Sequence, residues 1–130
     1  HLNTSHEILF DEDTLWAATT GGLVKYDMGS DTYEVLNTAD GMWDHDITAF
    51  ARDSRGIFAL GSFNGNLAFY DTHSGDILND QNLAVNEIID LEIVQDTLWA
   101  LTKSFVSVYL YSEDLNRYQF RESYAGYRAL

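Results

Sequence analysis

The stretch DTLWAAT at residues 13–19 decides the fold, because closely similar stretches recur twice further along the chain. These are RGIFALG at residues 55–61 and DTLWALT at residues 96–102, which place Trp16, Phe58 and Trp99 at matching positions. The aromatics are 42 and 41 residues apart. A repeat of about 40–45 residues is typical of a four-stranded β-propeller blade.

Each repeat divides into four short apolar runs separated by turn residues. The Asn64-Gly65 step between two runs of the middle repeat favours a hairpin. A sustained apolar stripe with a 3.6-residue period is missing, so we expect no helix. The expected strands are 7–11, 14–18, 22–26 and 33–37, then 47–51, 57–61, 66–70 and 76–79, then 88–94, 97–102, 107–111 and 118–121.

The sequence therefore predicts an all-β protein of three four-stranded antiparallel propeller blades. Blade 1 is expected at about 5–43, blade 2 at about 44–84 and blade 3 at about 85–126, with 127–130 as the start of a fourth blade. A blade buries its two faces only against neighbouring blades. We accordingly expect Trp16, Phe58 and Trp99 to be buried between blades.

Three blades do not close a ring, since propellers use about 4–8. Two flat blade faces are therefore expected to need cover. The expectation we favour is that the remaining blades belong to a longer chain. The alternative is a homo-oligomer, for example two copies that together supply six blades.

Composition excludes several classes of function. The chain has 130 residues, with 21 acidic and 7 basic side chains and a formal net charge of -14. Such a surface repels phosphate backbones and anionic lipids, so we expect neither nucleic-acid nor membrane binding. The sequence has no cysteine, which rules out disulfides, thiol nucleophiles and zinc-thiolate sites.

Two longer segments resemble a known repeat family. LWAATTGGLVKYD at residues 15–27 resembles the pattern L-W-x-G-T-x-x-G-L-x-x-Y-D of the two-component-regulator propeller repeat. DGMWDHDITAFARDSRG at residues 40–56 resembles the link of that family into its next blade, G-L-P-x-N-x-I-x-A-I-x-x-D-x-x-G. The chain departs from the family at Ala18, at Met42-Trp43 and at 103–106, where a glycine turn is usual.

The resemblance implies a setting for the protein. Propellers of this family form the extracytoplasmic sensor parts of bacterial hybrid histidine kinases, often for polysaccharide breakdown products, and similar ones occur in envelope and secretion-accessory proteins. It implies a periplasmic or cell-surface location. We expect a non-catalytic sensor or recognition propeller that binds a glycan or a protein partner. The alternatives are an assembly or secretion scaffold without a small ligand, and a lyase or hydrolase with its catalytic residues outside this segment.

The candidate ligand residues come from the propeller face that carries the links between blades and the turns between second and third strands. An exposed tryptophan beside carboxylates and an amide suits a sugar, because the ring stacks while polar groups bond hydroxyls. The other interpretation is that Trp43 packs over the blade junction. The candidates are Trp43, Asp44, His45, Asp46, Phe63, Asn64, Lys103 and Phe105.

Catalytic and metal motifs are missing from the sequence. The G-x-S-x-G nucleophile motif does not occur. The acidic runs at 11–13 and 44–46 lack the spacing of a calcium loop. A zinc site built from Asp44 and His45 would lack further ligands. We expect no enzyme activity in this segment, no cofactor and no metal.

Overall fold

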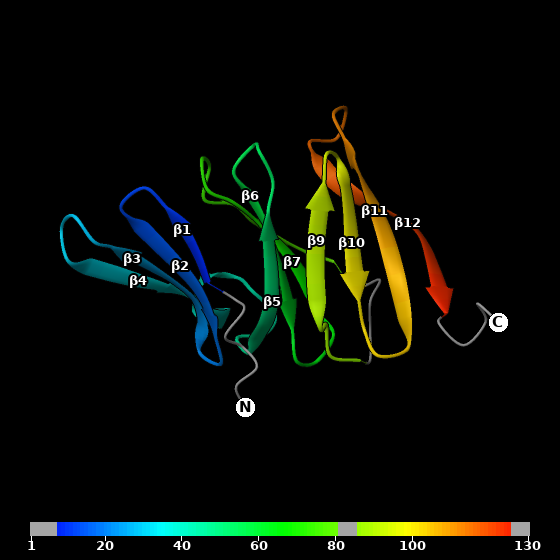
Figure 1. Ribbon diagram of the computed structural model, residues 1–130, viewed down its shortest axis with the longest axis horizontal. Coiled ribbons are helices and arrows are strands. Elements are labelled where there is room, and N and C mark those ends of the chain that lie inside the picture. Colours follow the sequence, from blue (N-terminus) through cyan, green and yellow to red (C-terminus); the bar gives the residue numbers. More distant parts are fainter. Residues whose placement is uncertain (1–7, 81–85, 126–130) are drawn as a thin grey trace.

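The chain folds into three separate four-stranded antiparallel sheets. The computed structural model describes residues 8–80 and 86–125, and Figure 1 shows their sheets side by side in chain order. Blade 1 contains β1 (Ile8–Asp11), β2 (Thr14–Thr19), β3 (Gly22–Asp27) and β4 (Thr32–Leu36). Blade 2 contains β5 (Ile47–Arg52), β6 (Ile57–Ser62), β7 (Leu67–Asp71) and β8 (Ile77–Asp80). Blade 3 contains β9 (Asp90–Val94), β10 (Thr97–Leu101), β11 (Phe105–Ser112) and β12 (Arg117–Ala125).

The strands of each sheet follow one another in simple up-and-down order, as in a propeller blade. This confirms the predicted all-β fold. Across the two described ranges, the helical structure is a 3₁₀ turn at Thr38–Asp40, which Asn37 caps by accepting a hydrogen bond from the Ala39 N–H at 2.9 Å. The predicted start of a fourth blade at 127–130 lies outside the described residues.

Each blade has two faces, which we name by direction along the chain. The forward face is turned toward the next blade and the backward face toward the previous one. Apolar side chains meet between the blades in two clusters. The first, between blades 1 and 2, includes Trp16, Ala18, Leu23, Leu36, Phe58, Leu60 and Ala68; the second, between blades 2 and 3, includes Ala59, Leu67, Phe69, Leu98, Ala100, Tyr109 and Tyr118.

Phe58 does not match Trp16 and Trp99, so the predicted equivalence of the three aromatics is wrong at this position. Asp11 pairs with Thr14 across a two-residue turn, whereas five residues separate the paired Arg52 and Phe58. The longer connection of blade 2 shifts the second strand by one residue, and a shift of one residue reverses which face a side chain occupies. Phe58 therefore points backward, toward blade 1.

The pairing with the third strand gives the true equivalence. Phe58 pairs with Tyr70 just as Leu15 pairs with Tyr26 and Leu98 with Tyr109. Leu15, Phe58 and Leu98 are thus the corresponding backward residues; those that correspond on the forward faces are Trp16, Ala59 and Trp99.

Trp99 is exposed, which contradicts the prediction that it is buried between blades. Trp16 is 5% exposed because its ring packs 4.6 Å from the ring of Phe58 in blade 2. Trp99 occupies the same forward position in blade 3 but is 41% exposed. The difference follows from position in the row of blades, because no described residues stack on the forward face of blade 3.

Polar contacts join neighbouring blades at their edges. Arg52 pairs with Asp11 at 2.7 Å, which joins blade 2 to blade 1. The buried Asp53 accepts a hydrogen bond from the Tyr118 hydroxyl at 2.8 Å, which joins blade 2 to blade 3. These contacts fix the packing of the three blades and therefore the shape of the grooves between them.

Candidate functional site

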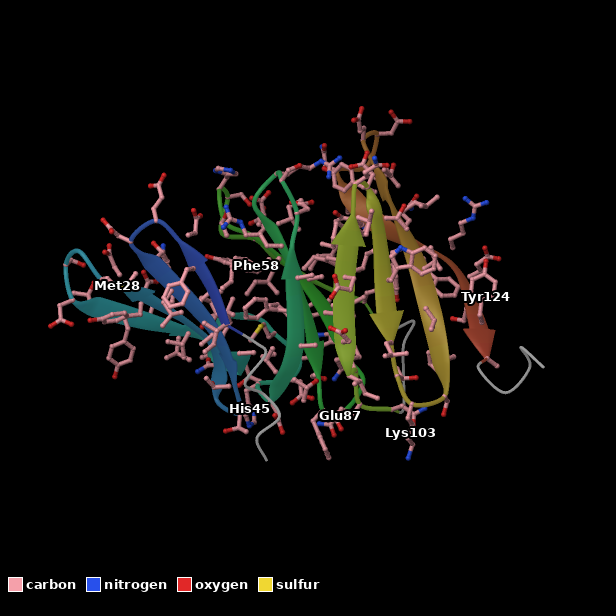
Figure 2. The ribbon with its side chains drawn as sticks, in the orientation of Figure 1. Met28, His45, Phe58, Glu87, Lys103 and Tyr124 are labelled. Carbon is pink, nitrogen blue, oxygen red and sulfur yellow. The ribbon has the colours of Figure 1, made fainter. Side chains whose placement is uncertain are left out.

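The links between blades and the turns between second and third strands lie along one edge of the row of blades, where the ligand residues were predicted. Figure 2 shows His45, Glu87 and Lys103 along the same edge, the lower one in that view. His45 lies in the link from blade 1 to blade 2, Glu87 in the link to blade 3, and Lys103 in the turn between β10 and β11. The links and the turns that follow each second strand therefore share one edge, as expected.

The link before blade 2 is joined to the turn between β6 and β7. Asn64 donates its side-chain amide to the Asp44 carboxylate at 2.8 Å, and the Phe63 N–H donates to the Asp46 carbonyl at 2.9 Å. Partial burial of Asp44 opposes its ionisation, but hydrogen bonds from Ser62, Asn64 and nearby backbone N–H groups outweigh this and hold its pKa below the usual value. Asp44 is thus a charged group that organises the link.

A small pocket lies beside this junction, and we call it the face pocket. It brings together the predicted residues Phe63, Asn64 and Lys103, which are drawn from the turns of blades 2 and 3. Its volume is about 330 Å³, and the Phe63 ring is 54% exposed. Its other lining residues are Asn86, Glu87 and Ile89.

Trp43 lies away from the face pocket, in a larger hollow that we call the rim groove. The rim groove has a volume of about 640 Å³ and runs between the outer strands β8 and β12. Trp43 is 47% exposed, so it is not fully packed over the blade junction. Its lining residues are Trp43, Leu78, Asn79, Asp80, Arg117, Tyr118, Gln119 and Phe120.

The backbone around Trp43 is anchored to blade 2. The Trp43 N–H donates to the Asn79 side-chain oxygen at 3.1 Å, and the Asn79 amide nitrogen donates to the Gly41 carbonyl at 2.9 Å. One side chain therefore joins both ends of the short segment that carries the ring. Anchoring of this kind lowers the entropy cost of binding a ligand.

Four predicted residues line neither hollow: Asp44, His45, Asp46 and Phe105. Asp44 and Asp46 instead hold the link against the turn between β6 and β7. Phe105 packs against the apolar cluster between blades 2 and 3, because its alternation along β11 turns it toward that core. His45 is exposed, and its N–H donates to Asp44 at 2.9 Å. The eight predicted residues are thus divided among the face pocket, the rim groove, the link and the core.

The sequence analysis missed the residues that surround Trp43 in the rim groove. Asn79 and Asp80 end the outer strand of blade 2, while Arg117, Gln119 and Phe120 belong to the outer strand of blade 3. These residues could have been considered only because they belong to the fourth strands, which form the outer edges of the blades.

A third hollow adjoins the rim groove and shares Leu78, Arg117 and Tyr118 with it. Its volume is about 560 Å³. There the Arg55 guanidinium lies 3.6 Å from the centre of the Tyr111 ring and pairs with Asp96 at 2.7 Å. Because Arg55 already contacts these residues of blade 3, we assign it a structural role in holding blades 2 and 3 together.

The structure shows no grouping of three or more His, Asp or Glu side chains that could hold a metal ion among residues 8–80 and 86–125. The same residues include no helix long and apolar enough to cross a membrane.

Comparison with known proteins identifies the fold. The chain matches the extracellular domain of BT4673 from B. thetaiotaomicron, described as a hybrid two-component system, with a TM-score of 0.72 and 18% identity over 92% of this chain and 17% of that one. It matches the β-propeller domain of Cps50 (Swd1) from Myceliophteria thermophila with a TM-score of 0.70 and 14% identity, over 88% of this chain and 42% of that one.

Designed proteins also match. The computationally designed Ika4 has a TM-score of 0.65 and 20% identity, over 79% of this chain and 63% of Ika4. The chain spans 34% of the related design Ika8. No protein-family model and no curated protein matches the sequence. At these identities the similarity shows the fold alone: the three sheets are β-propeller blades.

Proposed function

We propose that this chain supplies three blades of an extracytoplasmic recognition propeller of the two-component-regulator type, which binds a neutral oligosaccharide in the rim groove. The observation that carries the proposal is Trp43, whose backbone is anchored to Asn79 and whose side chain is half-exposed in a groove lined by polar residues. The likeness to the BT4673 extracellular domain supports the sensor setting and the location outside the cytoplasm.

The chemistry of the groove suits a sugar. A tryptophan ring offers a flat apolar face on which the C–H groups of a pyranose can stack. Asp80, Arg117 and Gln119 line the same groove, and polar residues at such a position can fix the orientation of hydroxyls. The rim groove thus combines an apolar platform with convergent polar groups.

Charge favours a neutral sugar over an acidic one. The net charge of -14 repels anionic ligands at long range. The groove itself is lined by one acidic residue, Asp80, and one basic residue, Arg117, so the long-range repulsion decides the preference. We therefore expect neutral oligosaccharides to bind more tightly than uronic-acid oligosaccharides of the same length.

The test is calorimetric titration of the chain with neutral gluco-, manno- and xylo-oligosaccharides and with matched uronic-acid oligomers. Removal of a stacked ring should cost about 2 kcal/mol, so Trp43→Ala should weaken the binding of a neutral ligand about 30-fold. Phe63→Ala, in the face pocket, is the matched control and should leave affinity within about twofold.

The result also assigns the site. Loss of binding in Phe63→Ala but not in Trp43→Ala would place the sugar in the face pocket and contradict the rim-groove proposal. Failure of every oligosaccharide to bind would contradict glycan recognition and favour the protein-partner or scaffold alternatives.

A further inference from the structure

The rim groove and the third hollow follow one another along the same two strands. Residues 77–78 of β8 and 117–118 of β12 line the third hollow, and residues 78–80 and 117–120 of these strands line the rim groove. A strand advances about 3.3 Å per residue, so the two hollows together accompany the outer strands for roughly 10 Å. A chain-like ligand therefore has a path between blades 2 and 3 that is longer than either hollow alone.

The two hollows meet at residues that leave this path open. Both are lined by Leu78, Arg117 and Tyr118. Tyr118 is 2% exposed and its hydroxyl donates to the buried Asp53 at 2.8 Å, so its ring forms a floor and does not project as a ridge. Leu78 and Arg117 are exposed and belong to opposite strands, so they stand on the two sides of this floor. The hollows are therefore two parts of one groove.

The third hollow offers polar side chains that are free to bond a ligand. Within residues 8–80 and 86–125, the side chains of Asp76, Asn116 and Arg117 make no hydrogen bond or ion pair. Beside them, Leu115 is 51% exposed and gives the hollow an apolar surface. An apolar surface next to such polar groups suits a sugar, which presents C–H groups and hydroxyls together. The third hollow thus repeats the combination found in the rim groove.

We propose that a neutral oligosaccharide chain lies lengthwise along both hollows, from Trp43 in the rim groove past Arg117 to Asn116 in the third hollow. This inference rests on the proposed function and extends it, because it makes chain length a determinant of recognition. Arg117 lines both hollows, so it is the residue expected to contact the sugar units on either side of the point where they meet.

Binding along both hollows raises affinity because the loss of translational and rotational freedom occurs once for the whole chain. Sugar units that reach the third hollow then add contacts without a second cost of that kind. A disaccharide bound beside Trp43 gains the contacts of the rim groove alone. We therefore expect a hexasaccharide to bind at least ~10-fold more tightly than the matching disaccharide, with no further gain once both hollows are filled.

The test is calorimetric titration of the chain with gluco-, manno- and xylo-oligosaccharides from the disaccharide to the octasaccharide. The variant that tests the third hollow combines Asp76→Ala with Asn116→Gly, where glycine keeps the left-handed backbone of Asn116 (φ 56°). It should bind the hexasaccharide ~10-fold more weakly than the unaltered chain does, and the disaccharide within about twofold. Gln95→Gly is the matched control, because Gln95 has φ 57° in a turn of the same blade and lines neither hollow. All three residues are exposed, so circular dichroism should show the native fold in both variants.

The double variant separates binding in the third hollow from a statistical effect. A longer repeating chain also gains affinity because it can bind in several registers, but that gain should be the same in the double variant. Equal affinity for all chain lengths, or a gain with length that the double variant retains in full, would overturn the inference. The proposed function would still stand in that case if Trp43→Ala weakened the binding of the disaccharide. If neither disaccharides nor longer chains bound, both would be overturned.

Discussion

Substitution of the two equivalent forward tryptophans should have very different effects on stability. Trp16 is 5% exposed, and its ring lies 4.6 Å from Phe58, 6.4 Å from Tyr70 and 5.4 Å from the Lys25 ammonium. Truncation of a buried tryptophan to alanine costs about 3–5 kcal/mol, so Trp16→Ala should lower the free energy of unfolding by about 4 kcal/mol. Trp99 is 41% exposed and lacks the described neighbours on one side, so Trp99→Ala should cost about 1 kcal/mol.

The assay is urea denaturation followed by far-ultraviolet circular dichroism, a signal that does not depend on the removed indole. Protein concentration must be low, because any partner bound to the Trp99 face would add to the stability of the folded state. Equal losses for the two variants in the monomer would refute the assignment of forward faces on which the fold description rests.

Three further predictions concern the contacts between blades 2 and 3. Gly61→Ala should destabilise the chain by about 1–3 kcal/mol in urea denaturation, because the new Cβ would lie 2.5 Å from Ile88 Cγ2; Ile88→Ala should relieve much of the loss, and no relief would contradict the close approach. Asp53→Ala should cost about 3 kcal/mol, since it leaves the Tyr118 hydroxyl and the buried Ile57 N–H without their acceptor, whereas a neutral result would contradict this role of Asp53. Burial raises the pKa of both Tyr109 and Tyr118, and the hydrogen bond to Asp53 raises that of Tyr118 further. These phenols therefore stay neutral in the folded state at a pH near 10, where unfolded tyrosine ionises. The stability they contribute should be complete below about pH 10 and decline as pH rises further, and the double Phe variant should show a shallower decline; identical pH profiles would contradict this.

Much of the fold could be predicted because each repeat contains four apolar runs of strand length separated by turn residues. The repeated DTLWA stretches of blades 1 and 3 each begin in a two-residue turn, so their strands align correctly by sequence. The second strand of blade 2 was aligned incorrectly, because the connection after Arg52 is longer than in the other blades. Phe58 was matched to the tryptophans by residue type and not by strand register. The small residues Ala59 and Gly61 were a usable signal, since they allow the close approach of blade 3.

The candidate site was less predictable because it depends on residues distant in sequence. The grouping of Phe63 and Asn64 with Lys103 follows from propeller geometry, in which turns of adjacent blades share an edge. The position of Trp43 depends instead on the side chain of Asn79, 36 residues later, and on the outer strand of blade 3. Neither contact leaves a local pattern in the link that carries the tryptophan.

The most direct test of stacked blades is a double-mutant cycle across the contact between blades 1 and 2. Trp16→Leu and Phe58→Leu, alone and combined, should show a coupling energy of about 1 kcal/mol in equilibrium unfolding, because the two rings touch although 42 residues separate them. The same cycle between Trp16 and Tyr118, which belong to different interblade clusters, should be additive within about 0.5 kcal/mol. Additivity for Trp16 and Phe58 would contradict the packing of one blade on the next.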